Sequence, residues 1–152
     1  IFSIKANEAL NEKSPQDRIV YALIDFDDIP DDDEWVSANG NEALLLTVFT
    51  NLLENACKYS PGKAAPKAQI RFQKNKWTLL VVDAGIGIPE KYKREIFTAF
   101  VRGSNVGNIE GTGLGLMLVH YLVQQHLGQI HIKSSIHKGT AVLISFPYNT
   151  FE

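Results

Sequence analysis

The stretch E-G-T-G-L-G-L-M-L-V-H, residues 110–120, decides the fold. Gly111, Gly113 and Gly115 leave backbone N–H groups uncovered by side chains, and apolar residues at helical spacing follow directly. A helix that begins here directs the positive end of its dipole at the glycine turn. Such an arrangement suits the phosphates of a nucleotide.

Two motifs upstream strengthen this interpretation, because a glycine turn before a helix is by itself common. N-L-L-E-N-A-C-K-Y-S at 51–60 places Asn51 and Asn55 on one face of a predicted helix. Neutral amide oxygens are hard ligands that suit Mg²⁺. D-A-G-I-G-I-P at 83–89 begins with Asp83, at the end of an apolar strand. The three motifs together predict a nucleotide site.

Composition indicates one globular domain. The chain has 152 residues, of which 45% are hydrophobic and 21% charged. A net charge of −2 gives no indication of binding to nucleic acid or to anionic lipid. Cys57 is the only cysteine, which excludes an internal disulfide, and we expect it in the core. Apolar runs such as 43–49 are too short to span a membrane. Because the first residue is not Met and no signal peptide precedes the fold, we expect a piece of a longer protein.

The order of the predicted elements indicates an α+β fold, a mixed but mostly antiparallel sheet with helices on one face. Trp35 and Trp77 fall in strands and are expected to be core or hairpin aromatics. Gly128 is expected to end the last helix. The predicted strands are 20–26, 35–38, 69–73, 77–82, 129–135 and 140–147; the predicted helices are a short one within 1–19, then 41–59, 89–100 and 113–127; the predicted loops are an acidic turn at 27–34 and a mobile loop at 101–111.

In these motifs the chain resembles the ATP-binding catalytic domain of sensor histidine kinases, which belong to the GHKL superfamily with type II topoisomerases, Hsp90 chaperones and MutL-type repair proteins. The resemblance covers about 20–147 and consists of blocks in the family's order: an asparagine box (51–60), a first glycine box (83–89), a phenylalanine box (96–100), a second glycine box (111–116) and K-G-T at 138–140. It implies a Bergerat fold, a two-layer α/β sandwich forming a single domain over 1–152, with an ATP lid at about 93–112.

The resemblance also implies ATP and Mg²⁺ as ligands. Asn55 would hold Mg²⁺, Asn51 would lie beside the triphosphate, and Lys58 would place an ammonium on the phosphates. Tyr59 would lay its ring against the purine. Asp83 would accept a hydrogen bond from the adenine amine. The nucleotide-binding set implied in this way is Asn51, Asn55, Lys58, Tyr59, Asp83, Gly85, Gly87, Ile88, Gly111, Thr112, Gly113, Leu114, Gly115, Leu116 and Thr140.

Within that set the expected roles differ. Gly85 and Gly87 would let the backbone approach the base, and Thr140 would fix the base directly or through water. Ile88 and Leu116 would wall the base pocket, although core packing accounts for either of them equally well.

The loop after the phenylalanine box would be the lid over the nucleotide. Phe97 and Phe100 bracket its start. Arg102 lies in the loop and would reach the γ-phosphate, where it would stabilise charge during phosphoryl transfer. With Asn51 and Lys58, Arg102 completes the predicted catalytic set.

One position separates kinases from hydrolases in the superfamily. The ATP hydrolases carry a glutamate four residues before the Mg²⁺-binding asparagine, as general base for water. Here that position is Asn51, whose amide cannot accept the proton, and Glu54 is expected to point elsewhere on the helix. The chain is therefore expected to transfer the phosphoryl group to an imidazole rather than to water.

The phosphoacceptor is expected outside this chain. His120, His126, His131 and His137 lack the surroundings of an acceptor histidine and are expected to be structural or on the surface. The partners implied are a His-containing dimerisation domain and a downstream response regulator, in a bacterial inner-membrane sensor whose kinase domain is cytoplasmic. An anti-sigma-factor-type serine kinase and a regulatory pseudo-kinase of the same fold remain alternatives.

Overall fold

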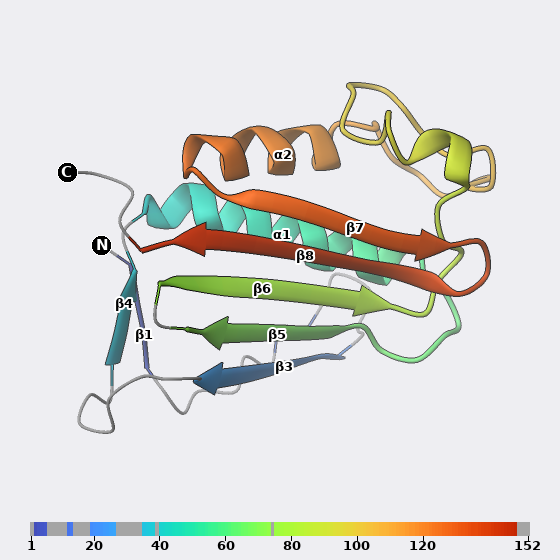
Figure 1. Ribbon diagram of the computed structural model, residues 1–152. Helices are drawn as coiled ribbons and strands as arrows, with labels where there is room; N and C mark the ends of the chain where they lie inside the picture. The colour runs from blue at the N-terminus through green and yellow to red at the C-terminus, as the bar shows by residue number, and fades with distance from the viewer. Residues whose placement is uncertain are drawn as a thin grey trace.

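The computed structural model describes residues 40–73 and 75–148 in full, and the backbone of four strands among the first 39 residues (Figure 1). Side chains before residue 40, Trp35 among them, and the acidic turn at 27–34 lie outside this description. The elements in chain order are β1 (Phe2–Lys5), β2 (Glu12–Lys13), β3 (Ile19–Phe26), β4 (Trp35–Ala38), α1 (Glu42–Lys58), β5 (Lys67–Phe72), β6 (Lys76–Asp83), the 3-10 helix η1 (Glu90–Tyr92), α2 (Gly115–Gln125), β7 (Gln129–Ser135) and β8 (Gly139–Pro147).

The main sheet has six strands in the order β2-β3-β5-β6-β8-β7. Only the β3–β5 pair is parallel; the other neighbours in this sheet are antiparallel. β1 and β4 form a separate antiparallel pair. The prediction of a mixed, mostly antiparallel sheet is confirmed.

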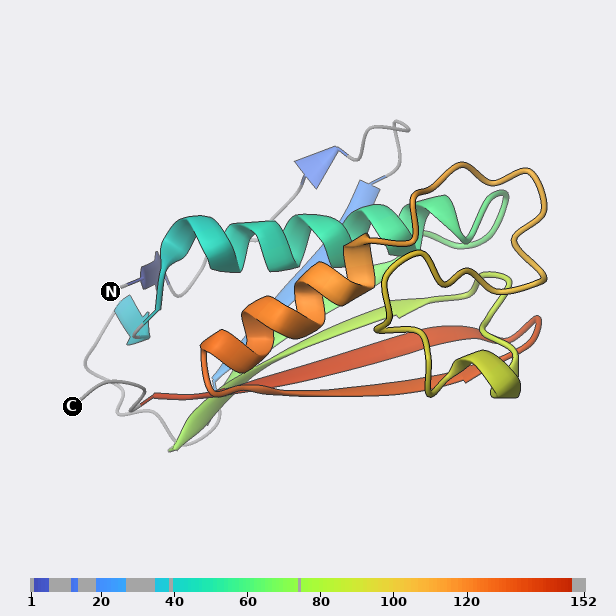
Figure 2. The ribbon, with the colours of Figure 1, turned by 90° about the horizontal axis from the view of Figure 1, so that it is seen from above.

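Both helices cover the same face of this sheet, and Figure 2 shows them lying at an oblique angle to each other over the strands. The domain is therefore the predicted two-layer α/β sandwich. The C-terminal end of α1, the N-terminal end of α2 and the end of β6 all lie at one end of the sandwich (Figure 1). Residues from the predicted boxes are brought together at this end.

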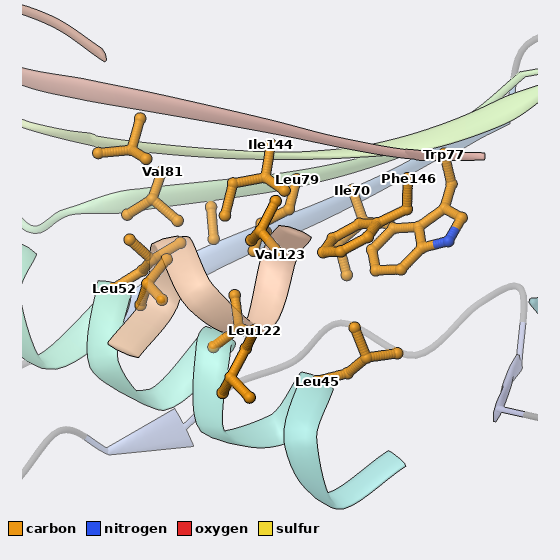
Figure 3. Packing of buried hydrophobic residues seen from close by; sticks show 14 of the residues in the cluster. Leu45, Leu52, Ile70, Trp77, Leu79, Val81, Leu122, Val123, Ile144 and Phe146 are labelled. Carbon is orange, nitrogen blue, oxygen red and sulfur yellow. The ribbon is translucent and has the colours of Figure 1, made fainter. Parts of the chain in front are cut away.

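The core lies between the helices and the sheet (Figure 3). α1 begins at the N-cap Asn41, whose Oδ1 accepts a hydrogen bond from the Leu44 N–H at 3.2 Å. Its apolar spacing at three and four directs one face inward, as the sequence predicted. The buried members of that face are Leu45, Val48, Leu52, Ala56 and Cys57, and they meet Val119, Leu122 and Val123 of α2 and the inward residues of β5, β6 and β8.

Trp77 anchors the part of this core that is remote from the predicted boxes. It is 1% exposed and stacks on Phe146, with ring centroids 4.4 Å apart. Phe72 stacks on it at 6.3 Å and Phe49 meets its edge at 6.1 Å. The prediction that Trp77 is a core aromatic is confirmed, and so is the core position of Cys57.

The two helices are also joined by a hydrogen bond. His126, the C-cap of α2, is 4% exposed, and its Nε2 accepts from the backbone N–H of Asn41 at 3.2 Å. The proton of the ring is therefore on Nδ1, which donates to the carbonyl of Leu122 at 2.8 Å. The end of α2 and the start of α1 are fixed to each other through this side chain.

The end of α2 differs from the prediction in detail. Leu127, rather than Gly128, takes the left-handed conformation, with φ 53°. Gly128 is required for a different reason, because a Cβ there would lie 2.8 Å from the carbonyl oxygen of Ser145. The helix still ends at this point, since the Gly128 N–H bonds back to the carbonyl of Val123 at 2.9 Å.

The predicted helix at 89–100 is wrong. Only Glu90–Tyr92 forms a 3-10 turn, and i to i+3 turns continue to Phe100. None of the residues from 90 to 100 is buried, so no packed face stabilises a longer helix. Within 1–19, Phe2–Lys5 and Glu12–Lys13 are strands, and the other positions at which the short helix was expected lie outside the described residues, apart from Ile19 at the start of β3.

Neither α1 nor α2 is long and apolar enough to cross a bilayer, and these are the α-helices of the described chain.

Candidate nucleotide site

A cavity of about 330 Å³ opens at the end of the sandwich where the predicted boxes meet. Its size is in the range of small-ligand sites. The predicted residues that line it are Asn51, Asn55, Lys58, Tyr59, Asp83, Gly87, Ile88, Arg102, Gly111, Thr112, Gly113, Gly115, Leu116 and Thr140. Gly85 and Leu114 were predicted as well but do not line it.

Two amides of α1 face the start of α2. The Nδ2 of Asn51 donates to the carbonyl of Thr47 at 2.8 Å, which fixes the amide so that Oδ1 is the atom left for the cavity. That oxygen lies 3.0 Å from where a Cβ on Gly115 would be, and the amide of Asn55 lies within 3.9 Å of the same point. A Cβ at 115 would therefore crowd the Asn51 amide, because α1 and α2 approach closely here.

The N-terminus of α2 has no side-chain cap. Its N-cap, Leu114, makes no side-chain hydrogen bond to the helix, and the first turn carries no acidic residue. The unpaired N–H groups of such a turn and the helix dipole both attract an anion. Amide oxygens from α1 and a positive helix end from α2 thus share one part of the cavity.

Lys58 adds a positive charge beside the glycine turn. A Cβ on Gly111 would lie 2.5 Å from the Lys58 Nζ, so ammonium and turn are adjacent. The same Nζ lies 4.9 Å from the centre of the Tyr59 ring. Lys58, the last residue of α1, and Tyr59, its C-cap, therefore both reach the second glycine box.

On the sheet side of the cavity, Asp83 and Thr140 lie beside each other on neighbouring strands, as register partners of β6 and β8. The Gly85 N–H donates to Asp83 Oδ1 at 2.8 Å. Thr140 Oγ1 lies 2.9 Å from the hydroxyl of Ser134 on β7. Ser134 is buried, and the sequence offered no signal for it beyond its strand position.

The cavity also has apolar walls. Ile88 and Leu116 line it as predicted, and Val81, Ile132 and Val142 add aliphatic surface from the sheet. The last three were missed, because alternating apolar residues in a strand indicate core packing and not a ligand wall. An apolar slot with a carboxylate at its end suits a flat, partly polar ring such as a purine base.

The glycines of the first box are held by the protein's own backbone. A Cβ on Gly85 would collide with the carbonyl of Tyr59, and one on Gly87 with the carbonyl of Ser135. Gly87 also has φ 70°, which disfavours other residues. Close approach of these glycines to a base stays a prediction; the observed reason for glycine is packing of the loop against α1 and β7.

The loop from Val101 to Thr112 is closed at its base. The Phe100 N–H donates to the carbonyl of Gly113 at 3.1 Å, so the two ends of the loop meet. Phe97, just before it, stacks on His120 of α2 at 4.7 Å. The loop is thus connected to the same helix that presents the glycine turn.

Two side chains of this loop are engaged within the protein. Arg102 Nη2 donates to the carbonyl of Ile109, and its Nε is buried without a hydrogen-bond partner. Asn105 Nδ2 donates to the carbonyl of Gly87 at 2.9 Å and to that of Ile86 at 3.3 Å. Asn105 was not predicted; it connects the loop to the first glycine box.

Glu54 was expected to point elsewhere on the helix than Asn55. It lines the cavity as an exposed carboxylate, next to Asn55 along α1. It does not occupy the position four residues before Asn55, which is that of Asn51.

Comparison with known proteins agrees with this geometry. The profile of the histidine kinase-, DNA gyrase B-, and HSP90-like ATPase family matches residues 40–150. Sporulation kinase A of Bacillus subtilis (strain 168) is 38% identical over 109 residues, which are 72% of this chain and 17% of that protein. The adaptive-response sensory kinase SasA of Gloeothece citriformis is 36% identical over 121 residues, 79% of this chain and 30% of that protein. The chain thus spans less than a third of the length of these relatives.

Solved structures show the same fold. The mycobacterial sensor histidine kinase MprB superposes with a TM-score of 0.66 at 24% identity, over 84% of this chain and 83% of that one. The catalytic domain of the histidine kinase ThkA gives 0.63 at 23% identity, over 85% and 79%. The predicted family and the predicted fold are both confirmed. This chain belongs to the histidine kinase-, DNA gyrase B- and HSP90-like ATPase family, and within it is an ATP-binding domain of the sensor histidine kinase type.

Proposed function

We propose that this domain binds ATP together with Mg²⁺ and supplies the γ-phosphoryl group to a histidine on a dimerisation domain outside the chain. The observation that carries the proposal is the meeting of two side-chain amides, of Asn51 and Asn55, with the uncapped start of α2 at Gly115. Such a site offers hard oxygen ligands on one side and an anion site on the other.

The residues present fit a magnesium ion. Asn55 would hold it, and Asn51 would lie beside the triphosphate with its oxygen fixed by the bond to Thr47. Mg²⁺, when bound, neutralises charge on the phosphates during transfer. Lys58, next to Gly111, would contact the phosphates from the other side of the glycine turn.

The base would occupy the apolar slot that ends at Asp83. A carboxylate there accepts a hydrogen bond from the exocyclic amine of adenine, whereas guanine presents a carbonyl oxygen at the same ring position. Tyr59, Ile88 and Leu116 line the cavity and would contact the base, and Thr140 would fix it beside Asp83.

The loop at 101–112 would act as the lid. Arg102 would have to leave the carbonyl of Ile109 before it reached a γ-phosphate, and its buried, unpartnered Nε favours such an exchange. The site would then be closed to water as the transfer begins.

Transfer to histidine rather than to water is favoured by the side chain at position 51. An amide cannot serve as general base, and its Nδ2 is already bonded to Thr47. By the resemblance, the partners would be the dimerisation domain and a response regulator, in a bacterial membrane sensor with this domain in the cytoplasm. The serine-kinase and pseudo-kinase alternatives are not favoured, because the similar proteins named above are sensor kinases and the nucleotide residues are intact.

Calorimetric titration with a non-hydrolysable ATP analogue tests the proposal. We expect the ATP analogue to bind with a dissociation constant in the micromolar range, and more tightly when Mg²⁺ is present. The affinity should fall at least tenfold in Asp83→Asn. The corresponding GTP analogue should show no measurable binding. Failure of the wild-type domain to bind the ATP analogue with or without Mg²⁺ would contradict it. Asn55→Ala is the matched variant for the metal: it should remove the dependence on Mg²⁺ while the Asp83 end still recognises adenine.

A further inference from the structure

The base end of the cavity contains a second layer that the sequence did not indicate. Asp83, Thr140 and Ser134 lie side by side on three adjacent strands, because Asp83 pairs with Thr140 and Thr140 pairs with Ser134. Asp83 and Thr140 line the cavity, whereas Ser134 lies behind Thr140 and is 8% exposed.

The hydroxyl of Ser134 makes three contacts. It accepts from the Ile88 N–H at 2.8 Å, donates to the carbonyl of Gly139 at 2.9 Å, and lies 2.9 Å from Thr140 Oγ1. A serine hydroxyl has one proton and two lone pairs. Since the proton goes to Gly139, the contact with Thr140 requires that Thr140 donates.

The single proton of Thr140 is then directed away from the cavity. What Thr140 presents to a ligand is its pair of oxygen lone pairs. Asp83 beside it is also an acceptor, with Oδ1 already receiving the Gly85 N–H. Of the neighbouring backbone donors, the Ile86 N–H bonds to the carbonyl of Tyr59 and the Ile88 N–H to Ser134.

We propose that Ser134 is a specificity-determining positioning residue, which orients the Thr140 hydroxyl so that the base end accepts hydrogen bonds and rejects a 6-oxopurine. The inference rests on the proposed ATP function. Adenine offers an amine at C6 and suits two acceptors. Hypoxanthine offers a carbonyl oxygen at C6, which would face the lone pairs of Thr140 without a proton between them.

Removal of the Ser134 hydroxyl frees the Thr140 proton. In Ser134→Ala, Thr140 can turn and donate to a 6-oxo group while Asp83 accepts the N1–H of hypoxanthine. The variant should therefore bind inosine triphosphate better relative to ATP. One neutral hydrogen bond corresponds to a roughly threefold to tenfold fall in the preference for ATP.

The test is the ratio of dissociation constants for non-hydrolysable ITP and ATP analogues, measured by calorimetry on the whole chain. The ratio should fall in Ser134→Ala, be kept in Ser134→Thr, and be unchanged in Ser135→Ala, the exposed neighbour on the same strand. Adding Thr140→Val to Ser134→Ala should bring the ratio to that of Thr140→Val alone, because the Thr140 donor is then absent and Ser134 has no hydroxyl left to orient. A merely structural role would weaken both nucleotides together and leave the ratio unchanged.

The outcomes separate the two proposals. If the wild type binds neither analogue, the ATP function fails. If it binds ATP but the ratio is the same in Ser134→Ala, the inference about Ser134 is overturned and the ATP function stands. Should Ser134→Ala not fold, Thr140→Val alone decides: it removes the acceptor facing C6 and keeps the bonds of Ser134 to Ile88 and Gly139, so the ratio must fall. An unchanged ratio there overturns the inference.

Discussion

The side-chain oxygen of Asn51 lies 3.0 Å from the position that a Cβ on Gly115 would occupy, so a methyl group there would push this amide aside where α1 meets α2. Gly115→Ala should displace the Asn51 amide from its bond with Thr47. We expect ATP affinity to fall about tenfold, the equivalent of roughly one hydrogen bond. Stability should not fall, because alanine favours the helix by up to about 1 kcal/mol.

Calorimetry and thermal unfolding on the same samples check this separation. Gln124→Ala, at an exposed position of α2, is the control and should change neither quantity. Equal losses of affinity and stability in Gly115→Ala would mean that the glycine serves packing alone.

Glu54 is exposed, is among the residues that line the cavity, and is the carboxylate of α1 nearest to Asn55 along the chain. It follows Asn51 by three positions and adjoins Asn55, so it points about 100° away from Asn55 around the helix. We expect phosphate release from ATP by the isolated chain to stay at the protein-free background, in the wild type and in Glu54→Gln. Release above background that falls in the variant would identify Glu54 as a base for water and move the chain to the hydrolase branch.

Leu127 takes a left-handed backbone conformation with φ 53°. Its side chain is 63% exposed, so little packing energy is lost when the side chain is removed. This conformation costs a residue with a Cβ about 1–2 kcal/mol, and glycine avoids that cost while losing some entropy on folding. Leu127→Gly should therefore raise the free energy of unfolding by up to about 1 kcal/mol in urea titrations. Gln125→Gly, two residues earlier in α2, should lower it by about 1 kcal/mol. A loss of stability in Leu127→Gly would contradict the assigned conformation.

His126 accepts a hydrogen bond from Asn41 and meets the Phe146 ring edge-on at 6.1 Å. His126→Ala leaves a backbone donor without its partner and opens space in the core. We expect a loss of about 2–3 kcal/mol in the free energy of unfolding. His131→Ala, at an exposed position of β7, should change it by less than about 0.5 kcal/mol. Similar effects of the two substitutions would show that the Asn41 bond does not stabilise the fold.

Tyr148 is expected to make the stability of the domain fall at alkaline pH. Burial raises the pKa of its phenol above the ordinary value of 10.0, although a backbone hydrogen bond with Gln73 acts in the opposite direction. Because the folded pKa is the higher one, the stabilisation is complete below about pH 10 and is lost as the pH rises through the folded pKa. Urea unfolding at about pH 8 and pH 11 should show a smaller loss for Tyr148→Phe than for the wild type. An equal loss would assign the alkaline transition to other groups.

How much of this could be predicted depends on whether a residue acts through a local pattern. The asparagine-box helix was predicted within one residue at each end, because its apolar spacing and the Asn41 cap are local. The segment at 89–100 has similar apolar residues, but none of those from 90 to 100 is buried, so its pattern was misleading. Packing against a partner, rather than periodicity, decides such a short helix.

The predicted site residues came from the boxes, and most of them line one cavity. Ser134 and Asn105 were missed, since one serine in a strand and one asparagine in a loop carry no spacing signal. Their partners are 46 and 18 residues away along the chain. Such contacts follow from strand register and loop path, which composition and periodicity do not determine.

The bond between His126 and Asn41 has a mechanical consequence. It joins the start of α1 to the end of α2, whereas Asn55 and Gly115 meet at the other end of the helix pair. The hydrogen bond can therefore act as a hinge at the end remote from the proposed phosphate site. From Asn41 to Asn55, α1 extends about 21 Å at 1.5 Å per residue. A rotation of about 3° at the hinge moves the tip by about 1 Å, and a misplacement of that size can cost a hundredfold in rate. A buried histidine remote from the nucleotide would thereby set the alignment of the residues that hold it.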